Sequence, residues 1–312
     1  MNKRDVVLEL VHGEPRSGYV PSAFFLHFDP AYQRGQAAVN KHLEFFHHTG
    51  MDFVKIQYEQ TQPRMELVRK PEDWRRMPYY PQTYFDATVA VVEGLVKAAQ
   101  KDALVILTLY SPLMWAMQLA EGIDLAAHLR ENPDPVAKGL EIMTENVLNL
   151  VRRCKQVGVD GFYVSTQGGE SFRLKGTDFF QRYIKPTDLA VWSELTSCRF
   201  NVLHICDYVG AYDDITPFVD YPGDVVNCSL HVGDRTMSPQ EAADFFTRPF
   251  MGGMKRKGVI ATGKPGEIRE AAEAVLAVAP RRFMLAADCT VPGDTSWDNL
   301  KIAIDTAHQH HG

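Results

Sequence analysis

The sequence lacks the features that mark several large classes of protein. No apolar run reaches the roughly 18 residues of a membrane-spanning helix, and the amino terminus has no apolar stretch long enough for a signal peptide. Basic residues are not in excess, since 33 Lys and Arg stand against 39 Asp and Glu, a net charge of −6. A nucleic-acid-binding surface would need a basic excess. We therefore expect a cytoplasmic protein that binds neither a membrane nor a nucleic acid.

Cysteine is scarce, and its number is odd. The five cysteines are scattered along the chain, which does not suit a disulfide framework and favours a reducing compartment. Cys154 and Cys198 fall in helical patterns and are expected to be plain core or surface thiols. Any function of the other three, Cys206, Cys228 and Cys289, should therefore use thiolates.

A glycine-rich phosphate-binding fingerprint is also missing after the first candidate strand, which runs into HFDPAYQRGQ. This absence disfavours the open doubly wound sheet, the main rival to a closed barrel. Apolar runs of strand length alternate with amphipathic helical patterns in about eight units, the number that a (β/α)8 barrel needs. The predicted strands are 21–28, 52–58, 103–110, 160–166, 200–206, 224–230, 257–262 and 282–288.

The segments between these strands predict helices and one long insertion. Helices are expected at 34–49, 84–101, 136–157, 178–197, 238–247, 265–279 and 296–309. Ser238, Pro239 and Glu241 form a capping-box pattern, and Thr295 or Ser296 opens the last helix. The insertion at 60–81 is rich in proline, aromatic and basic residues and is predicted to form a lid over the barrel mouth. The whole chain, 1–312, is expected to be one α/β TIM-barrel domain.

Reactive side chains gather where the predicted strands end, which is the rim that carries the active site in this fold. His27, Tyr58 and Tyr110 are expected to line the pocket there. Gln118 and Gln167 are further candidates for binding a small-molecule substrate. Glu59 is a candidate acid or base, or a residue that positions substrate, because the pKa of a carboxylate under a lid is readily shifted.

The most specific local pattern is LHICDYVG. His204 and Cys206 are two apart in a strand and therefore point to the same face, and Cys289 ends the last strand, which a closed barrel brings across the mouth. One imidazole and two thiolates are suitable ligands for zinc, with the fourth position open for catalysis. Cys228, Ser229 and His231 are alternatives for a fourth ligand, between which the sequence does not choose.

Two further groups near this site have open roles. Asp288 either orients a ligating imidazole or caps its loop. The basic run Lys255, Arg256 and Lys257 either meets an anionic group or lies in solvent.

The residues resemble the uroporphyrinogen decarboxylase superfamily, which includes zinc-dependent methylcobamide:coenzyme M methyltransferases and is related to cobalamin-independent methionine synthase. The resemblance runs nearly end to end and rests on these segments: TGMDFVKIQYE, RKPEDW, SPLMWAMQLAEG, LHICD, GGMKRKGVIATG and CTVPGDTSWDNLKIAI. It implies a barrel with its site at the mouth.

Within that superfamily, the resemblance is greatest to the methyltransferase branch, because His204, Cys206 and Cys289 match its zinc motif. True decarboxylases have an arginine-rich amino-terminal stretch, whereas PSAFFLHFDPAYQRGQ contains only Arg34. Glu59, Gln118 and Asp288 stand where decarboxylases have an aspartate, a tyrosine and a histidine. The branch's usual acidic fourth ligand is not present in NCSLHV.

The resemblance implies a zinc-dependent methyltransferase, which moves a methyl group between a corrinoid carrier or a methoxylated compound and a thiol-type nucleophile. The sequence has no DxHxxG-type cobalamin loop, so a corrinoid would come on a partner protein. The alternative is a carboxy-lyase that acts on a tetrapyrrole or a smaller acid without a cofactor.

Overall fold

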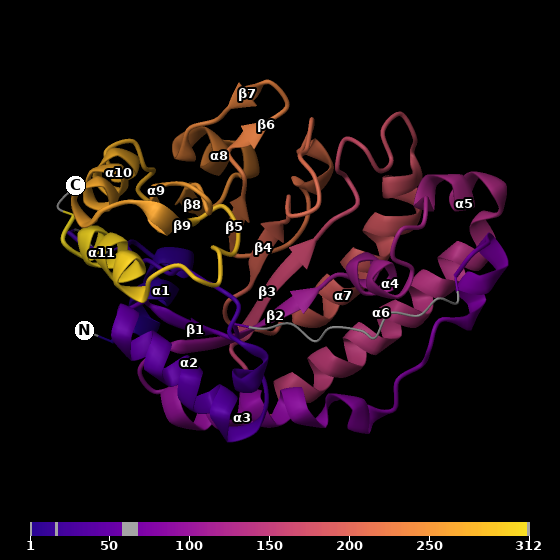
Figure 1. Ribbon diagram of the computed structural model, residues 1–312, viewed down its shortest axis with the longest axis horizontal. Coiled ribbons are helices and arrows are strands. Elements are labelled where there is room, and N and C mark those ends of the chain that lie inside the picture. Colours follow the sequence, from indigo (N-terminus) through magenta and orange to yellow (C-terminus); the bar gives the residue numbers. More distant parts are fainter. Residues whose placement is uncertain (1, 16–17, 58–67, 311–312) are drawn as a thin grey trace.

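A curled parallel sheet forms the centre of the protein (Figure 1). The computed structural model describes residues 2–15, 18–57 and 68–310. Seven strands pair in the order β1-β2-β3-β4-β5-β8-β9, so the strands of this sheet follow one another in chain order, and a separate two-stranded hairpin lies between β5 and β8 in the sequence. Such an order is typical of successive right-handed βα units. The strands are β1 (Phe53–Lys55), β2 (Leu104–Tyr110), β3 (Gly161–Thr166), β4 (Val202–Ile205), β5 (Val225–Cys228), β8 (Phe250–Met254) and β9 (Phe283–Ala287). The α/β architecture is therefore confirmed.

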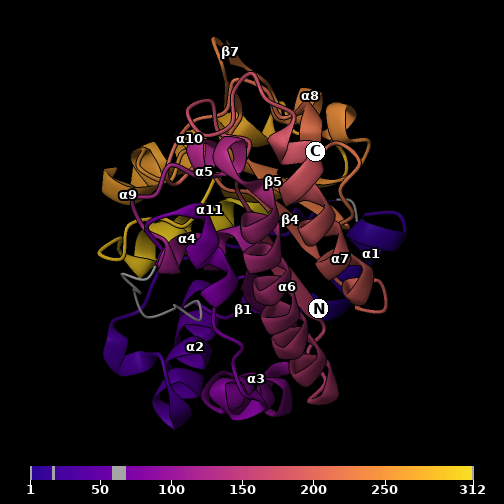
Figure 2. The same ribbon diagram turned by 90° about the vertical axis from the view of Figure 1, so that its right-hand side faces the viewer.

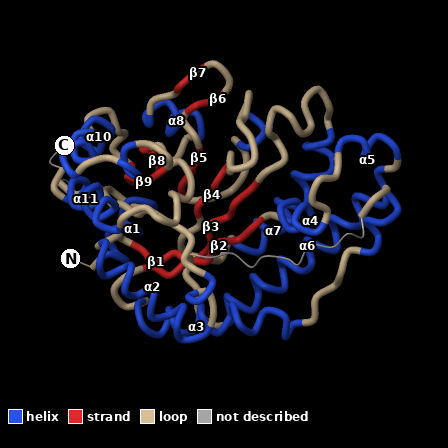
Figure 3. The backbone as a smooth tube through the Cα atoms, in the orientation of Figure 1, coloured by secondary structure: helices blue, strands red, loops and turns tan. Residues whose placement is uncertain are grey.

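Helices surround this sheet (Figure 2, Figure 3). They are α1 (Lys3–His12), α2 (Gly35–Thr49), α3 (Asp86–Ala99), α4 (Pro112–Leu119), α5 (Leu125–Glu131), α6 (Pro133–Gln156), α7 (Lys185–Leu195), α8 (Pro239–Phe246), α9 (Val259–Thr262), α10 (Pro265–Leu276) and α11 (Trp297–His308). The capping box of Ser238 and Glu241 is present, and Ser296 caps α11. None of the helices within the described ranges has the length and apolar character that crossing a bilayer requires.

One predicted strand is wrong. Residues 257–262 contain the short helix α9, and the strand of this unit is β8, which precedes it. The apolar, β-branched run GVIAT resembles a strand, whereas FMGGM contains two glycines, which are poor strand formers. The fold uses these glycines in β8 because Gly253 has φ +99°, and a Cβ there would lie 2.3 Å from Cγ1 of Val275 in α10.

The predicted first strand, 21–28, is not a regular strand, but it joins the two edges of the sheet. Ser22 and Leu26 form isolated parallel bridges with Leu285 and Val291 on the β9 side. On the other side, the amide of Asp52 donates a 3.0 Å hydrogen bond to the carbonyl of Ser22, just before β1. The segment therefore lies along the seam between β9 and β1.

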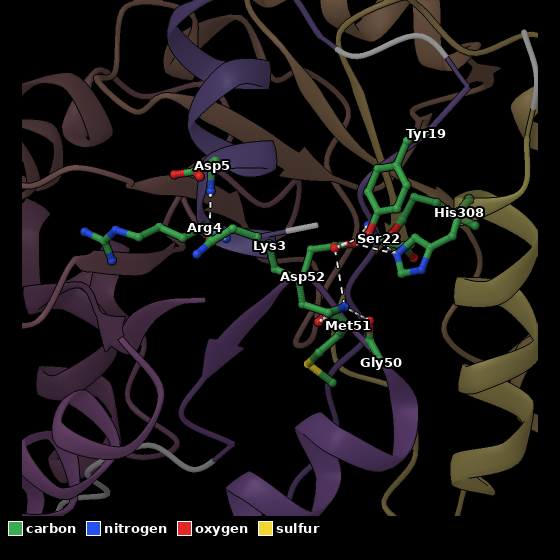
Figure 4. A network of polar contacts seen from close by, with 11 residues as sticks. Lys3, Arg4, Asp5, Tyr19, Ser22, Gly50, Met51, Asp52 and His308 are labelled. Carbon is green, nitrogen blue, oxygen red and sulfur yellow. Dashed lines mark hydrogen bonds and ion pairs between the residues drawn. The ribbon is translucent and has the colours of Figure 1, made fainter. Parts of the chain in front are cut away.

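A buried carboxylate holds this seam (Figure 4). Asp52 is fully buried and accepts hydrogen bonds from the amide of Ser22 at 2.7 Å and from the hydroxyl of Tyr19. His308 Nε2 lies 2.8 Å away, and the Lys3 ammonium forms an ion pair with Asp52 at 3.5 Å. The network thereby ties α1 and α11, at the two ends of the chain, to the seam.

Helix α1 was not predicted from the sequence, and it packs at the amino-terminal ends of the strands. Its Arg4 forms a 2.8 Å ion pair with Asp160, immediately before β3. Arg282, immediately before β9, donates to the carbonyl of Leu10 in α1 at 2.9 Å. This end of the sheet is therefore covered, which leaves the carboxyl ends for a site.

The lid predicted at 60–81 is not confirmed. Residues 58–67 lie outside the described part of the chain. The described remainder packs on α5 and α6, where the buried indole of Trp74 donates to Nδ1 of His128 at 3.0 Å and Asn146 bonds the backbone of Pro78 and Tyr80. These contacts anchor residues 71–80 to the outside of two helices.

Candidate metal and substrate site

A cavity of about 940 Å³ opens at the carboxyl ends of the strands. Its wall contains seven residues that the sequence analysis named as candidates for the site, His27, Tyr110, Gln118, Gln167, His204, Cys206 and Cys289. Much of the rest of the wall comes from α4 with the loop after it, and from the loops that follow β3 and β4, while β1, β2 and β3 contribute Lys55, Thr108, Tyr163 and Ser165. No described residue of 68–81 lines this cavity. Tyr58 and Glu59 lie outside the described residues, so their roles stay predictions.

The imidazole and the two thiols that the sequence singled out meet in the wall of this cavity. Their ligand atoms all lie within 4.8 Å of one another, and Cys289 Sγ is 3.4 Å from His204 Nε2. His204 lies in β4, Cys206 directly follows that strand, and Cys289 lies just beyond β9. In the sheet β4 and β9 are separated by β5 and β8, so the curl of the sheet brings the three groups together.

The cluster is buried, and its two thiols influence each other. The exposed fractions of His204, Cys206 and Cys289 are 2%, 5% and 7%. The hydrogen bond with Cys289, together with burial, raises the pKa of Cys206 to about 12. Accepting that bond lowers the pKa of Cys289 below its ordinary value. Of the two thiols, Cys289 is therefore the one that ionises first.

These residues fit a soft divalent cation. Nδ1 of His204 is buried and has no hydrogen-bond partner among the described residues, while its other nitrogen faces Cys289. One nitrogen and two sulfurs, held together away from water, are the donor types that zinc takes in proteins. The amide of Gln167 contacts Sγ of Cys206 at 3.5 Å and steadies that thiol. His204, Cys206 and Cys289 are thus the residues that could hold a metal.

A fourth protein ligand is not evident in the described part of the chain, where this cluster of His, Cys, Asp and Glu has three members. Cys228 is not among them, and His231 is exposed in the hairpin of β6 (His231–Val232) and β7 (Arg235–Thr236). Ser229 contacts the backbone of His231 at 3.2 to 3.3 Å. A metal held by these three residues would be left with room for a further ligand from the cavity.

Asn227, paired with His204 in the sheet register, is engaged elsewhere. Its Nδ2 donates to the carbonyls of Met251 and Ala287, and its Oδ1 accepts from Tyr163. These three bonds join β3, β5, β8 and β9 beneath the thiols. Asn227 therefore fixes the positions of these strands relative to one another next to the site.

Asp288 contacts Arg256 in this structure, and no contact with His204 is observed. Its Oδ1 accepts a 2.9 Å bond from the backbone amide of Arg256 and lies 3.4 Å from the guanidinium. Of the two roles expected for Asp288, these contacts match the one that holds a loop. Arg256 is mostly shielded from solvent, with 14% of its side chain exposed.

A buried lysine in the cavity wall escaped the sequence analysis. Lys55 in β1 is 2% exposed, and its ammonium lies 4.6 Å from the ring centre of Phe25 and 4.9 Å from that of Tyr163. The available signal was one lysine within the apolar run DFVKIQY. Arg173, paired with Glu170 at 3.0 Å, adds a second cation to the wall. The site thus combines soft ligand atoms with two cationic side chains in its wall.

Comparisons with known proteins give both a family and a fold. The family model described as Uroporphyrinogen decarboxylase (URO-D) matches residues 46–310, which is most of the chain. No curated protein sequence matches the chain.

Two solved structures are similar over nearly their whole length. A methyltransferase from Methanosarcina mazei is 14% identical with a TM-score of 0.77, and the match covers 98% of each chain. A B12-independent methionine synthase from Shewanella sp. W3-18-1 in complex with selenomethionine is 12% identical with a TM-score of 0.60, and the match covers 94% of this chain and 97% of the other. At these identities the likeness is one of fold.

Proposed function

The chain belongs to the uroporphyrinogen decarboxylase family, and from this premise we propose that it is a zinc-dependent methyltransferase. It moves a methyl group between a corrinoid carrier or a methoxylated compound and a thiol-type nucleophile. The observation that carries the proposal is the buried cluster of His204, Cys206 and Cys289, which opens on a cavity large enough for a small-molecule substrate. The fold shared with the M. mazei methyltransferase supports it.

In this proposal, different side chains bind the metal, exclude water and attract the substrate. His204, Cys206 and Cys289 would hold the zinc, which would supply a binding position for the thiol of the substrate. Bound zinc lowers the pKa of a thiol and keeps it as a nucleophilic thiolate. Met114 and Tyr110, packed against the two cysteines, exclude water from the sulfur atoms. Lys55 and Arg173 attract an anionic group of the substrate.

The proposal also assigns roles to other residues and to a partner protein. Glu59 is proposed as an acid or base, and His27, Gln118 and Gln167 as substrate contacts. The corrinoid is proposed to arrive on a partner protein. We interpret the curled sheet as a single-domain (β/α)8 barrel in which residues 21–28 take the place of the eighth strand. We also propose a cytoplasmic location.

Metal analysis tests the proposal directly. We expect about one zinc per chain in purified protein, and at least roughly 100-fold weaker zinc binding in the variants Cys206→Ser and Cys289→Ser, because each removes a ligand. Cys198→Ser is the matched control, since this half-buried thiol lies outside the cluster. Wild-type protein that is folded but binds no zinc would reject the proposal.

Methyl transfer is measured separately. Methylcobalamin and a small anionic thiol are mixed with the zinc-loaded protein, and the absorption of the cobalamin reports loss of its methyl group. We expect turnover by the wild type and at least roughly 100-fold less by Cys206→Ser. Equal rates for the two proteins would show that the cluster does not carry the reaction.

Decarboxylation is the second candidate, and the description of the matching family favours it. Uroporphyrinogen, incubated with the protein and separated by chromatography, would yield coproporphyrinogen. The scarcity of arginine around Arg34 predicts no product, because an octa-anionic substrate needs several fixed guanidinium groups. Product formed at similar rates by wild type and Cys206→Ser would establish decarboxylation instead.

A further inference from the structure

Arg256 links the two segments that carry the thiols. Its Nη1 lies 2.7 Å from Oδ1 of Asp207, the residue directly after Cys206, and 3.4 Å from Oδ1 of Asp288, the residue directly before Cys289. Its backbone amide donates to the same oxygen of Asp288 at 2.9 Å. One arginine thus contacts the immediate neighbours of both cysteines.

The regular sheet does not hold these cysteines in place by itself. β4 ends at Ile205 and β9 ends at Ala287, so Cys206 and Cys289 both lie past the last residue of their strands. Backbone bonds remain on each side, from the amide of Cys206 to Thr166 and from that of Asp288 to Met254. Among the contacts of the described residues, Arg256 is the side chain that bridges Asp207 and Asp288.

The charged groups that Arg256 joins are largely shielded from solvent. Asp207 and Asp288 have 16% of their side chains exposed and Arg256 has 14%, so solvent screens the three groups only partly. Charge-assisted bonds in such surroundings are stronger than surface ion pairs. Without the guanidinium, the carboxylates of Asp207 and Asp288 would repel each other. Because each carboxylate is one residue from a thiol, this repulsion would push Cys206 and Cys289 apart.

We propose that Arg256 is a positioning residue, which clamps the segment after β4 to the segment after β9 and so holds Cys206 and Cys289 at the spacing of a metal-binding pair. The inference rests on the proposed function of these thiols as zinc ligands. Of the basic run at 255–257, it assigns to Arg256 a role inside the protein, whereas Lys255 and Lys257 are exposed.

Metal affinity and spectrum test the clamp. In Arg256→Met we expect Co²⁺ and Zn²⁺ binding, measured by competition with a chelator, to weaken by roughly 10- to 100-fold. The thiolate-to-cobalt absorption should also change, because it depends on the geometry of the two sulfurs. Arg256→Lys keeps the charge and one contact, so its affinity should lie between those of wild type and Arg256→Met.

The matched control is Arg248→Met. Arg248 is also a part-buried arginine, but it donates to the carbonyls of Val219, Tyr221 and Gly223, far along the chain from both thiols. The loss of these bonds should lower stability without changing the cobalt spectrum. A spectrum and affinity altered equally in Arg248→Met and Arg256→Met would mean a general loss of stability and would overturn the clamp.

A metal-free measurement separates this inference from the proposed function. Phenylarsine oxide forms two As–S bonds with a close pair of thiols, and its oxygen leaves as water with the two thiol protons. Capture should be roughly tenfold slower in Arg256→Met than in wild type, with Cys206→Ser setting the background. If wild type bound no zinc, the methyltransferase proposal would fail, yet slower capture would still support the clamp. Capture and metal affinity both unchanged in Arg256→Met would overturn it.

Discussion

Asp188 is a carboxyl group buried behind the end of β3. One of its oxygens, Oδ2, accepts hydrogen bonds from Thr166 at 2.6 Å and from Tyr221 at 3.0 Å, while Oδ1 has no partner among the described residues. Burial raises the pKa of Asp188 to about 7, against the lowering effect of the two hydroxyl groups. Thr166, which bonds Asp188, directly precedes Gln167, and Gln167 lines the cavity. The carboxyl group of Asp188 therefore lies just behind the cavity wall.

The raised pKa predicts a pH-dependent stability. The folded protein binds this proton more tightly than the unfolded chain, so the stabilisation is complete below the ordinary pKa of 3.8 and is lost as the pH rises through about 7. Relative to Asp188→Asn, the free energy of unfolding of the wild type should therefore fall by about 3 kcal/mol between pH 5 and pH 8. Urea unfolding at both pH values measures it.

Asp213→Asn provides the comparison for this titration, because Asp213 is an exposed carboxylate paired with Lys175. Its pH profile should follow that of the wild type. A profile for Asp188→Asn that also runs parallel to the wild type would contradict the prediction.

At the scale of elements, strand β8 depends on its glycine pair. Gly253 needs both a left-handed φ of +99° and room beside Val275 of α10, so helix and strand pack more closely than a side chain would allow. The strand then delivers Arg256 to the thiol-bearing segments just beyond its end. Local packing at β8 and the geometry of the site are therefore connected.

Replacing this glycine should be costly. We expect Gly253→Ala to lower the free energy of unfolding by about 2 to 4 kcal/mol, because the new methyl group adds a clash to the backbone strain. Gly50→Ala isolates the backbone part, since Gly50 has φ +75° and no atom lies within 4 Å of a Cβ there. It should cost only about 1 kcal/mol. Equal losses in the two variants would argue against the clash with Val275.

At the scale of the whole molecule, the sheet is joined into one body along the seam between β9 and β1. Residues 21–28 form two isolated bridges and backbone hydrogen bonds with Leu285, Val291 and Asp52, and side chains add to this hydrogen bonding. Asp52 provides the centre, with contacts to Lys3, Tyr19, Ser22 and His308 (Figure 4). Both chain ends therefore contribute to keeping the seam together.

Asp52→Ala should destabilise the protein strongly. It leaves the buried amide of Ser22 without its acceptor and removes the carboxylate that Lys3, Tyr19 and His308 share, for which we expect a loss of about 3 to 5 kcal/mol in thermal or urea unfolding. Asp298→Ala is the matched control, because this carboxylate also pairs with a histidine, His48, but is 75% exposed. Its cost should stay below about 1 kcal/mol. Similar losses in both variants would count against a special role of the seam.

Much of this architecture was predictable from local patterns. The predicted strands at 52–58, 103–110, 160–166, 200–206, 224–230 and 282–288 contain β1 to β5 and β9, because strands covered on both faces are nearly continuous in apolar residues. The misplaced strand at 257–262 shows where the pattern fails. The true strand, β8, contains glycines because helix α10 packs closely against it. Strand propensity is a property of each residue and does not depend on a helix that lies elsewhere in the sequence.

The sequence by itself determined the alternation of strands and helices and the three soft ligand residues, since period and spacing are properties of a short stretch of chain. Only the tertiary structure decided that His204, Cys206 and Cys289 converge, that Lys55 faces the cavity, and that Arg256 spans Asp207 and Asp288. These are contacts between residues far apart in the chain, and they exist only once the sheet has curled and its seam has been joined. Local hydrogen bonding and sequence periodicity do not determine how far the sheet curls or how its two edges are joined.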